Sequence, residues 1–131
     1  ARVRLWLDAR APDRTRLDAW EAGVRDAAAG LLDATGVTIE ATVASRSDGV
    51  VFDDRVRGAL RVAVREAVGR EVPELVCYAG HDAGIVAERR PAGMVFARNP
   101  TGVSHSPEEA VSLEDAAVAA TALAAALREL A

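Results

Sequence analysis

The feature that most constrains this chain is a repeated change in the spacing of its apolar residues. Three stretches place apolar residues every three or four positions, the spacing of an amphipathic helix: residues 13–36, 56–69 and 112–130. Other segments alternate apolar with polar residues, as half-buried strands do, at 3–9 and 37–43, and residues 93–97 read as a buried strand. Strands that alternate with helices predict an α/β layered arrangement.

Capping residues mark the ends of the predicted helices. Asp13 or Thr15 can cap the first helix, and Gly36 can supply the left-handed turn after it. Ser112, with Asp115 three residues on, predicts the start of the last helix.

The same periodicity predicts which side chains face a core. These are Leu17, Trp20, Val24, Ala27, Ala28, Leu31 and Leu32 in the first helix, Val56, Leu60, Ala63, Val64 and Ala67 in the second, and Ala116, Ala120, Leu123, Leu127 and Leu130 in the last. Gly69 and Pro73 end the second helix, and a further short helix is predicted over 83–88.

Composition narrows the class of protein. The 131 residues carry a formal charge of -4 with no run of like charge, so we expect no nucleic-acid and no membrane partner. A single cysteine, Cys77, excludes an internal disulfide framework. No apolar run approaches the ~20 residues that cross a bilayer, and nothing resembles a signal peptide, so we expect a cytoplasmic protein.

The organisation of the chain suggests two parts. The small polar stretch at 45–49 indicates a boundary, which divides residues 1–47 from residues 48–131. The chain starts without Met and already inside a strand-like pattern, so we expect a chain cut from something longer.

Both histidines, His81 and His105, lie among small residues in the most irregular segments, where α/β proteins usually build their sites. A Ser–His–Asp hydrolase is rejected, because His81 and Asp82 are adjacent and no Gly-x-Ser-x-Gly elbow is present. Cys77 with His81 would suggest a thiol nucleophile or a zinc pair, but a metal site needs three or four ligands. Cys77 is more simply a buried small residue.

Two segments together carry a family resemblance: Tyr78-Ala79-Gly80-His81-Asp82-Ala83, and Gly93-Met94-Val95-Phe96 running on to Gly102-Val103-Ser104-His105-Ser106-Pro107-Glu108-Glu109. They resemble the C-terminal signatures of the dinuclear-metal M20 amidohydrolases, in the branch of N-carbamoyl-L-amino-acid hydrolases, allantoate amidohydrolases and β-ureidopropionases. Leu7-Asp8-Ala9-Arg10 resembles a strand of the family's lid domain.

The resemblance implies a fold and a set of roles. Residues 1–47 would be the second half of an α+β lid, or dimerisation, domain, and residues 48–131 the C-terminal part of a zinc-exopeptidase-like α/β catalytic domain. His105 would be a ligand of a pair of divalent ions, zinc or manganese, with Ser104 or Glu108 orienting it. Arg10 would bind the substrate carboxylate. Ala79, Gly80 and His81 would line the substrate pocket.

Plainer interpretations stand beside these. Arg10 could be a solvated arginine, and His105 could cap the turn before Pro107. Asp82 and Glu109 are more simply helix-start residues than catalysts. The chain also departs from the family at Cys77-Tyr78, where Ser-Gly is common. The family's other ligands and its general-base glutamate have no match here, so no catalytic residue is assigned within the chain.

The resemblance therefore predicts part of a metal-dependent amidohydrolase that acts on N-carbamoyl-L-amino acids or allantoate-like ureido acids, inactive as this chain alone. A homodimer formed through the lid domain is implied as well. The alternative from another class is a non-catalytic remnant that serves as a dimerisation module. An aminoacylase or peptidase of the same superfamily is disfavoured by residues 79–83.

Overall fold

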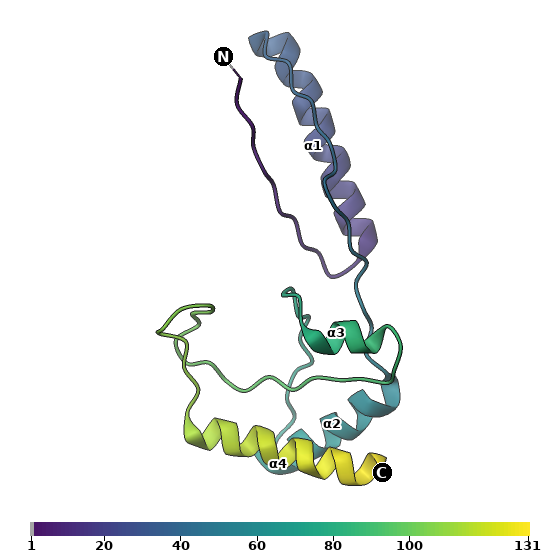
Figure 1. Ribbon diagram of the computed structural model, residues 1–131, viewed down its shortest axis with the longest axis vertical. Coiled ribbons are helices and arrows are strands. Elements are labelled where there is room, and N and C mark those ends of the chain that lie inside the picture. The colour runs from purple at the N-terminus through teal and green to yellow at the C-terminus, as the bar shows by residue number, and fades with distance from the viewer. Residues whose placement is uncertain (1) are drawn as a thin grey trace. The chain divides into compact units, whose positions relative to one another are not determined.

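The computed structural model describes residues 2–131 (Figure 1). The chain divides into two compact units. The first unit is the chain up to Gly49 together with Val76–Ala79, and the second is Val50–Leu75 with Gly80–Ala131. The described residues form the helices α1 (Arg14–Thr35), α2 (Asp54–Val68), α3 (Asp82–Ala87) and α4 (Leu113–Leu130).

The predicted caps of the long helices are confirmed. The carboxylate of Asp13 accepts the backbone N–H of Arg16 at the start of α1, and Gly36 ends α1 with φ 71°. The hydroxyl of Ser112 accepts the N–H of Asp115 at 3.0 Å at the start of α4. Each cap satisfies backbone groups that the helix itself leaves unpaired, which is why the ends could be placed from sequence.

The predicted strands at 3–9, 37–43 and 93–97 are wrong for the structure of residues 2–131, which contains no strand. Figure 1 draws all three as coil. A strand exists only where a neighbouring segment shares its backbone hydrogen bonds, and none of these segments has such a neighbour. The helices of the α/β arrangement predicted from periodicity are therefore present among the described residues, whereas its sheet is not confirmed there.

The core of the second unit lies between α2 and α4. Its buried residues are Leu60, Ala63, Ala122 and Ala126, with Ala122 fully buried. On α2 the predicted face is confirmed, since Leu60 and Ala63 are buried and the other three predicted residues pack partly against them.

On α4 the predicted face is wrong. Leu123 and Leu127 remain 42% and 67% exposed, whereas Ala122 and Ala126 meet α2. Because α4 is apolar on most sides, periodicity alone cannot select the face that is buried. Small alanine side chains let two helices approach closely, which favours the face observed.

The segment after α3 also lies against α2. The N–H of Asp53 donates to the carbonyl of Ala92 at 3.2 Å, and Val95 packs partly against the core. A Cβ added at Gly93 would lie 2.7 Å from Cγ1 of Val56 and 2.9 Å from Cδ1 of Leu60. Glycine is thus required at 93 by the closeness of the chain to α2.

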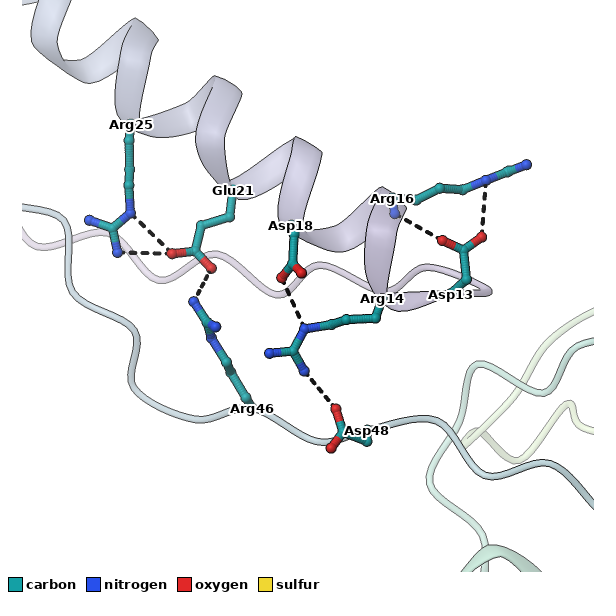
Figure 2. Close-up of polar contacts among 8 residues, drawn as sticks. All are labelled: Asp13, Arg14, Arg16, Asp18, Glu21, Arg25, Arg46 and Asp48. Carbon is teal, nitrogen blue, oxygen red and sulfur yellow. Dashed lines mark hydrogen bonds and ion pairs between the residues drawn. The ribbon is translucent and has the colours of Figure 1, made fainter.

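The first unit is held by ion pairs and not by a buried core. Glu21 pairs with both Arg25 and Arg46, and Arg14 pairs with both Asp18 and Asp48 (Figure 2). These pairs tie residues 46–48 to α1. The predicted core face of α1 is wrong in this unit, because α1 contains no buried residue.

Among residues 2–131, no helix has the length and apolar character to cross a membrane.

Candidate functional site

The predicted metal ligand His105 lies in a tight turn after a long loop. It has φ 58°, and it is the one residue other than glycine with a left-handed backbone among those described. Its N–H donates to Oε2 of Glu109 at 2.9 Å, and the N–H of Glu109 donates to the carbonyl of Ser106 at 3.0 Å. Glu109 is therefore not a helix-start residue as predicted; it closes the turn, and α4 begins at Leu113.

Asn99 organises the loop that leads to this turn. Its side-chain amide donates to the carbonyl of Val103 at 2.6 Å, while its Oδ1 accepts both the N–H and the hydroxyl of Thr101. Gly102, with φ 66°, lies between Thr101 and Val103, where the chain turns back. Local hydrogen bonds of this kind are typical of Asn in turns, and they keep the predicted loop free of regular structure.

The loop is also tied to the start of α4. Nε of Arg98 donates to Oδ2 of Asp115 at 3.1 Å, and the hydroxyl of Ser112 donates to the same oxygen at 2.7 Å. The Ser112 hydrogen bond, with that of Arg98 and the charge of Arg98, lowers the pKa of the Asp115 carboxyl below its ordinary value. Both ends of the loop border an open pocket of about 260 Å³, lined by Ala97, Arg98, Asn99, Glu109, Ala110 and Val111.

His81 has a structural role that the sequence analysis missed. Its Nδ1 accepts the N–H of Ala83 at 3.2 Å and so caps α3. This hydrogen bond needs an unprotonated Nδ1, so the neutral ring carries its proton on Nε2 and presents a donor there. The prediction that Asp82 is a helix-start residue is confirmed, since Asp82 is the first residue of α3.

Arg10 donates hydrogen bonds to two residues of the first unit. Its Nη2 and Nε donate to Oδ2 of Asp8 at 2.7 and 3.2 Å, and its Nη1 donates to the carbonyl of Tyr78 at 2.9 Å. The hydrogen bonds from Arg10, together with its charge, lower the pKa of the Asp8 carboxyl. The Arg10 guanidinium is thus bound beside the residue that precedes Ala79, while its side chain remains 54% exposed to solvent.

The predicted site residues are distributed over both units. Arg10 and Ala79 belong to the first, whereas Gly80, His81 and His105 belong to the second, and all five are exposed. Cys77 is half-buried, and its thiol donates to the carbonyl of Ala79. The assignment of these residues to substrate and metal binding stays a prediction.

Two residues of the site were not singled out by sequence reasoning: Asp8 beside Arg10, and Glu109 as the acceptor for His105. For each of them, the sequence has a spacing that could have indicated its contact. The alternating pattern of residues 3–9 already places Asp8 and Arg10 on one side of the chain. Glu109 lies four residues after His105, a spacing that a single turn of chain brings together.

The described part of the chain contains no group of three or more His, Cys, Asp or Glu side chains placed to hold a metal ion. His105 by itself suits the role of one ligand. It is exposed, and its hydrogen bond uses the backbone N–H, so neither ring nitrogen is occupied by a bond from residues 2–131.

Comparison with known proteins gives a consistent family assignment. The chain is 32% identical to the N-carbamoyl-L-amino-acid amidohydrolase of Rhizobium meliloti over 130 residues, which are 99% of this chain and 31% of that protein. It is 37% identical to the allantoate amidohydrolase of Bacillus subtilis (strain 168) over 86 residues, 66% of this chain and 21% of that protein. A probable allantoate deiminase of Oryza sativa subsp. japonica is 46% identical over 65 residues, 50% of this chain and 13% of that protein.

The chain therefore spans less than a third of the length of these relatives. No solved structure gives a significant match. The sequence pattern of Peptidase family M20/M25/M40 matches residues 8–129. The resemblance inferred from the two motifs is confirmed, and the chain belongs to Peptidase family M20/M25/M40.

Proposed function

We propose that this chain is the C-terminal part of a metal-dependent amidohydrolase that cleaves the C–N amide or ureido bond of N-carbamoyl-L-amino acids or allantoate-like ureido acids. The observation that carries the proposal is the match of 99% of the chain to the N-carbamoyl-L-amino-acid amidohydrolase of Rhizobium meliloti. Allantoate is kept as a second substrate because two further relatives bear names of allantoate-degrading enzymes.

His105 would contribute one ligand to a pair of zinc or manganese ions. Among residues 2–131, no group of three or more His, Cys, Asp or Glu side chains is placed to hold such a pair. The remaining ligands and the general base would then come from residues outside these 131. On this proposal the isolated chain does not catalyse, and no chemical step is assigned to it.

Arg10 would bind the substrate carboxylate, because its planar guanidinium can donate two parallel hydrogen bonds to a carboxylate. Two of its donor nitrogens already serve Asp8, so the substrate carboxylate would compete with that side chain. His81 would present its Nε2–H beside Ala79 and Gly80 in the wall of the substrate pocket, with the ring held by its cap to Ala83. The cytoplasmic location and the pairing of lid domains stay predictions.

A hybrid enzyme tests the proposal. Residues 1–131 replace the matching segment of the Rhizobium meliloti protein, and the purified hybrid is assayed with N-carbamoyl-L-amino acids, allantoate, N-acetyl amino acids and dipeptides. We expect hydrolysis of the first two classes, its loss in His105→Ala, and no turnover by the isolated chain. A preference for N-acetyl amino acids or dipeptides would instead indicate an aminoacylase or peptidase.

The alternative, a non-catalytic dimerisation module, is favoured by one observation. Val3, Leu5 and Trp6 are 81%, 81% and 76% exposed, which leaves an apolar, unpaired extended segment on the first unit. Analytical ultracentrifugation of the chain would show a dimer that Leu5→Lys dissociates. If the hybrid folds but is inactive and the chain forms such a dimer, the dimerisation module is the correct interpretation and the enzyme proposal is wrong.

A further inference from the structure

The turn at His105 has a left-handed backbone conformation, which residues other than glycine adopt uncommonly. With φ 58°, the Cβ of His105 is crowded by its own carbonyl group. Such conformations persist where neighbouring contacts determine them, and they are found preferentially at functional sites. The question is which contact holds this one.

Glu109 makes that contact. Its Oε2 accepts the N–H of His105 at 2.9 Å, and its own N–H donates to the carbonyl of Ser106 at 3.0 Å. These two hydrogen bonds hold residues 105–109 in a closed turn. A carboxylate is a stronger acceptor than a neutral carbonyl, so this bond is well suited to offset the cost of the left-handed residue.

The neighbouring glutamate provides a contrast. Glu108 accepts the hydroxyl of Ser106, and its N–H donates to the oxygen of the same hydroxyl at 3.3 Å. Among the hydrogen bonds of residues 2–131, none joins Glu108 or Ser104 to His105. The expectation that Ser104 or Glu108 orients His105 is therefore not met by any contact in this part of the chain.

We propose that Glu109 is the positioning residue for His105. By holding the N–H of His105, its carboxylate keeps the backbone left-handed and so sets the direction in which the imidazole leaves the chain. That the orientation of the imidazole matters for metal binding rests on the proposed function, in which His105 is a ligand. The hydrogen bond itself does not depend on that function, so the two are tested separately.

Amide hydrogen exchange of the metal-free 131-residue chain, measured by NMR, tests the bond. In Glu109→Ala we expect the His105 amide to exchange about tenfold faster, because a bond to a charged acceptor is lost. Glu109→Gln keeps an acceptor oxygen and should recover most of the protection, and Glu108→Ala should leave it unchanged. Unchanged His105 exchange in Glu109→Ala, or equal effects of the two alanine variants, would overturn the proposal.

Metal affinity of the hybrid enzyme tests the consequence. Substitutions that disturb the orientation of a ligand typically lower metal affinity by about 10–100-fold, and we expect this for Glu109→Ala at an unchanged melting temperature. Glu109→Gln should restore most of the affinity, and Glu108→Ala should match the parent hybrid. A general loss of folding would not produce this pattern.

His105→Ala separates the two ways in which the affinity test can fail. If it lowers metal affinity while Glu109→Ala does not, the positioning role is wrong and the ligand assignment stands. If neither substitution changes the affinity, the ligand assignment of the proposed function is wrong, and the exchange result then describes only a turn.

Discussion

The two units of this chain are stabilised in different ways. The second packs α2 against α4 through a small apolar core, in which Ala122 is fully buried. The first has no buried residue among those described, and its long helix α1 is held to residues 46–48 by arginine–carboxylate pairs. Burial of apolar surface is the main driving force of folding, whereas exposed ion pairs contribute little each.

This difference bears on the proposed site. His105 and the loop anchored by Arg98 to Asp115 belong to the unit with a core, whereas Arg10 belongs to the unit held by ion pairs. A metal ligand must be held in a narrow range of positions, and a unit with its own core suits that requirement. The contrast predicts that substitutions in the second unit cost much more stability than those in the first.

The largest effect is expected from Leu60→Ala. Removing a buried leucine side chain from the α2–α4 core should lower the free energy of unfolding by about 2–4 kcal/mol, through lost burial and the cavity left behind. Leu127→Ala on the exposed side of α4 is the matched control and should change stability by less than about 0.5 kcal/mol. Urea denaturation measures both, and equal effects would show that α4 packs by its predicted leucine face.

Gly93→Ala should destabilise the second unit by about 1 kcal/mol or more, because the new methyl group would overlap Val56 and the buried Leu60. Gly58→Ala, inside α2 with open space around it, should have the opposite sign and stabilise by up to about 1 kcal/mol. Thermal melts of the two variants compare them directly. A stabilising Gly93→Ala would mean that residues 92–95 do not approach α2.

Acid should weaken the contact between Arg98 and Asp115, which ties the loop to the start of α4. The pKa of Asp115 is lowered from its ordinary value of 3.8, so its charged form contributes stability at neutral pH that is lost as the pH falls below that value and through the folded pKa. Asp115→Asn should lower the melting temperature near neutral pH and flatten its fall in acid. Glu114→Gln, in the same helical turn, is the control. Parallel melting curves for Asp115→Asn and the parent from about pH 7 down to about pH 2 would mean that the charge of Asp115 does not stabilise the contact with Arg98.

The smallest effect is expected from Glu21→Gln in the first unit. It removes the charge that pairs with Arg25 and Arg46, and exposed pairs are worth less than about 1 kcal/mol each. The helical signal of α1 should fall slightly, and the difference from the parent should shrink in high salt, where charges are screened. Asp26→Asn on the same helix is the control. A loss as large as that of Leu60→Ala would mean that ion pairs can replace a core here.

Local features of the fold could be predicted and long-range ones could not. The helix ends at Asp13, Gly36 and Ser112 follow from hydrogen bonds within a few residues, so sequence alone places them. Strand pairing depends on segments far apart in the chain. The alternation at 3–9 predicts which side of an extended segment would be buried, but not which segment would pair with it. The buried face of α4 was missed for a related reason, since its apolar residues surround the helix.

The candidate site shows the same division. Motif resemblance led to the M20 family, which the match over residues 8–129 confirms. The bonds from Arg10 to Tyr78 and from Arg98 to Asp115 join residues 68 and 17 positions apart, and no local pattern indicates them. The hydrogen bond from the His105 N–H to Glu109 lay within reach of sequence reasoning, because the two residues are four positions apart, but Glu109 was interpreted only as a helix-start residue.

Native mass spectrometry of the hybrid enzyme, prepared with zinc or manganese, measures whether His105 is a ligand of a two-metal centre. We expect two metal ions per hybrid subunit, one fewer in folded His105→Ala, and none on the isolated 131-residue chain. If His105→Ala retained two metal ions at parental affinity, His105 would not be a ligand.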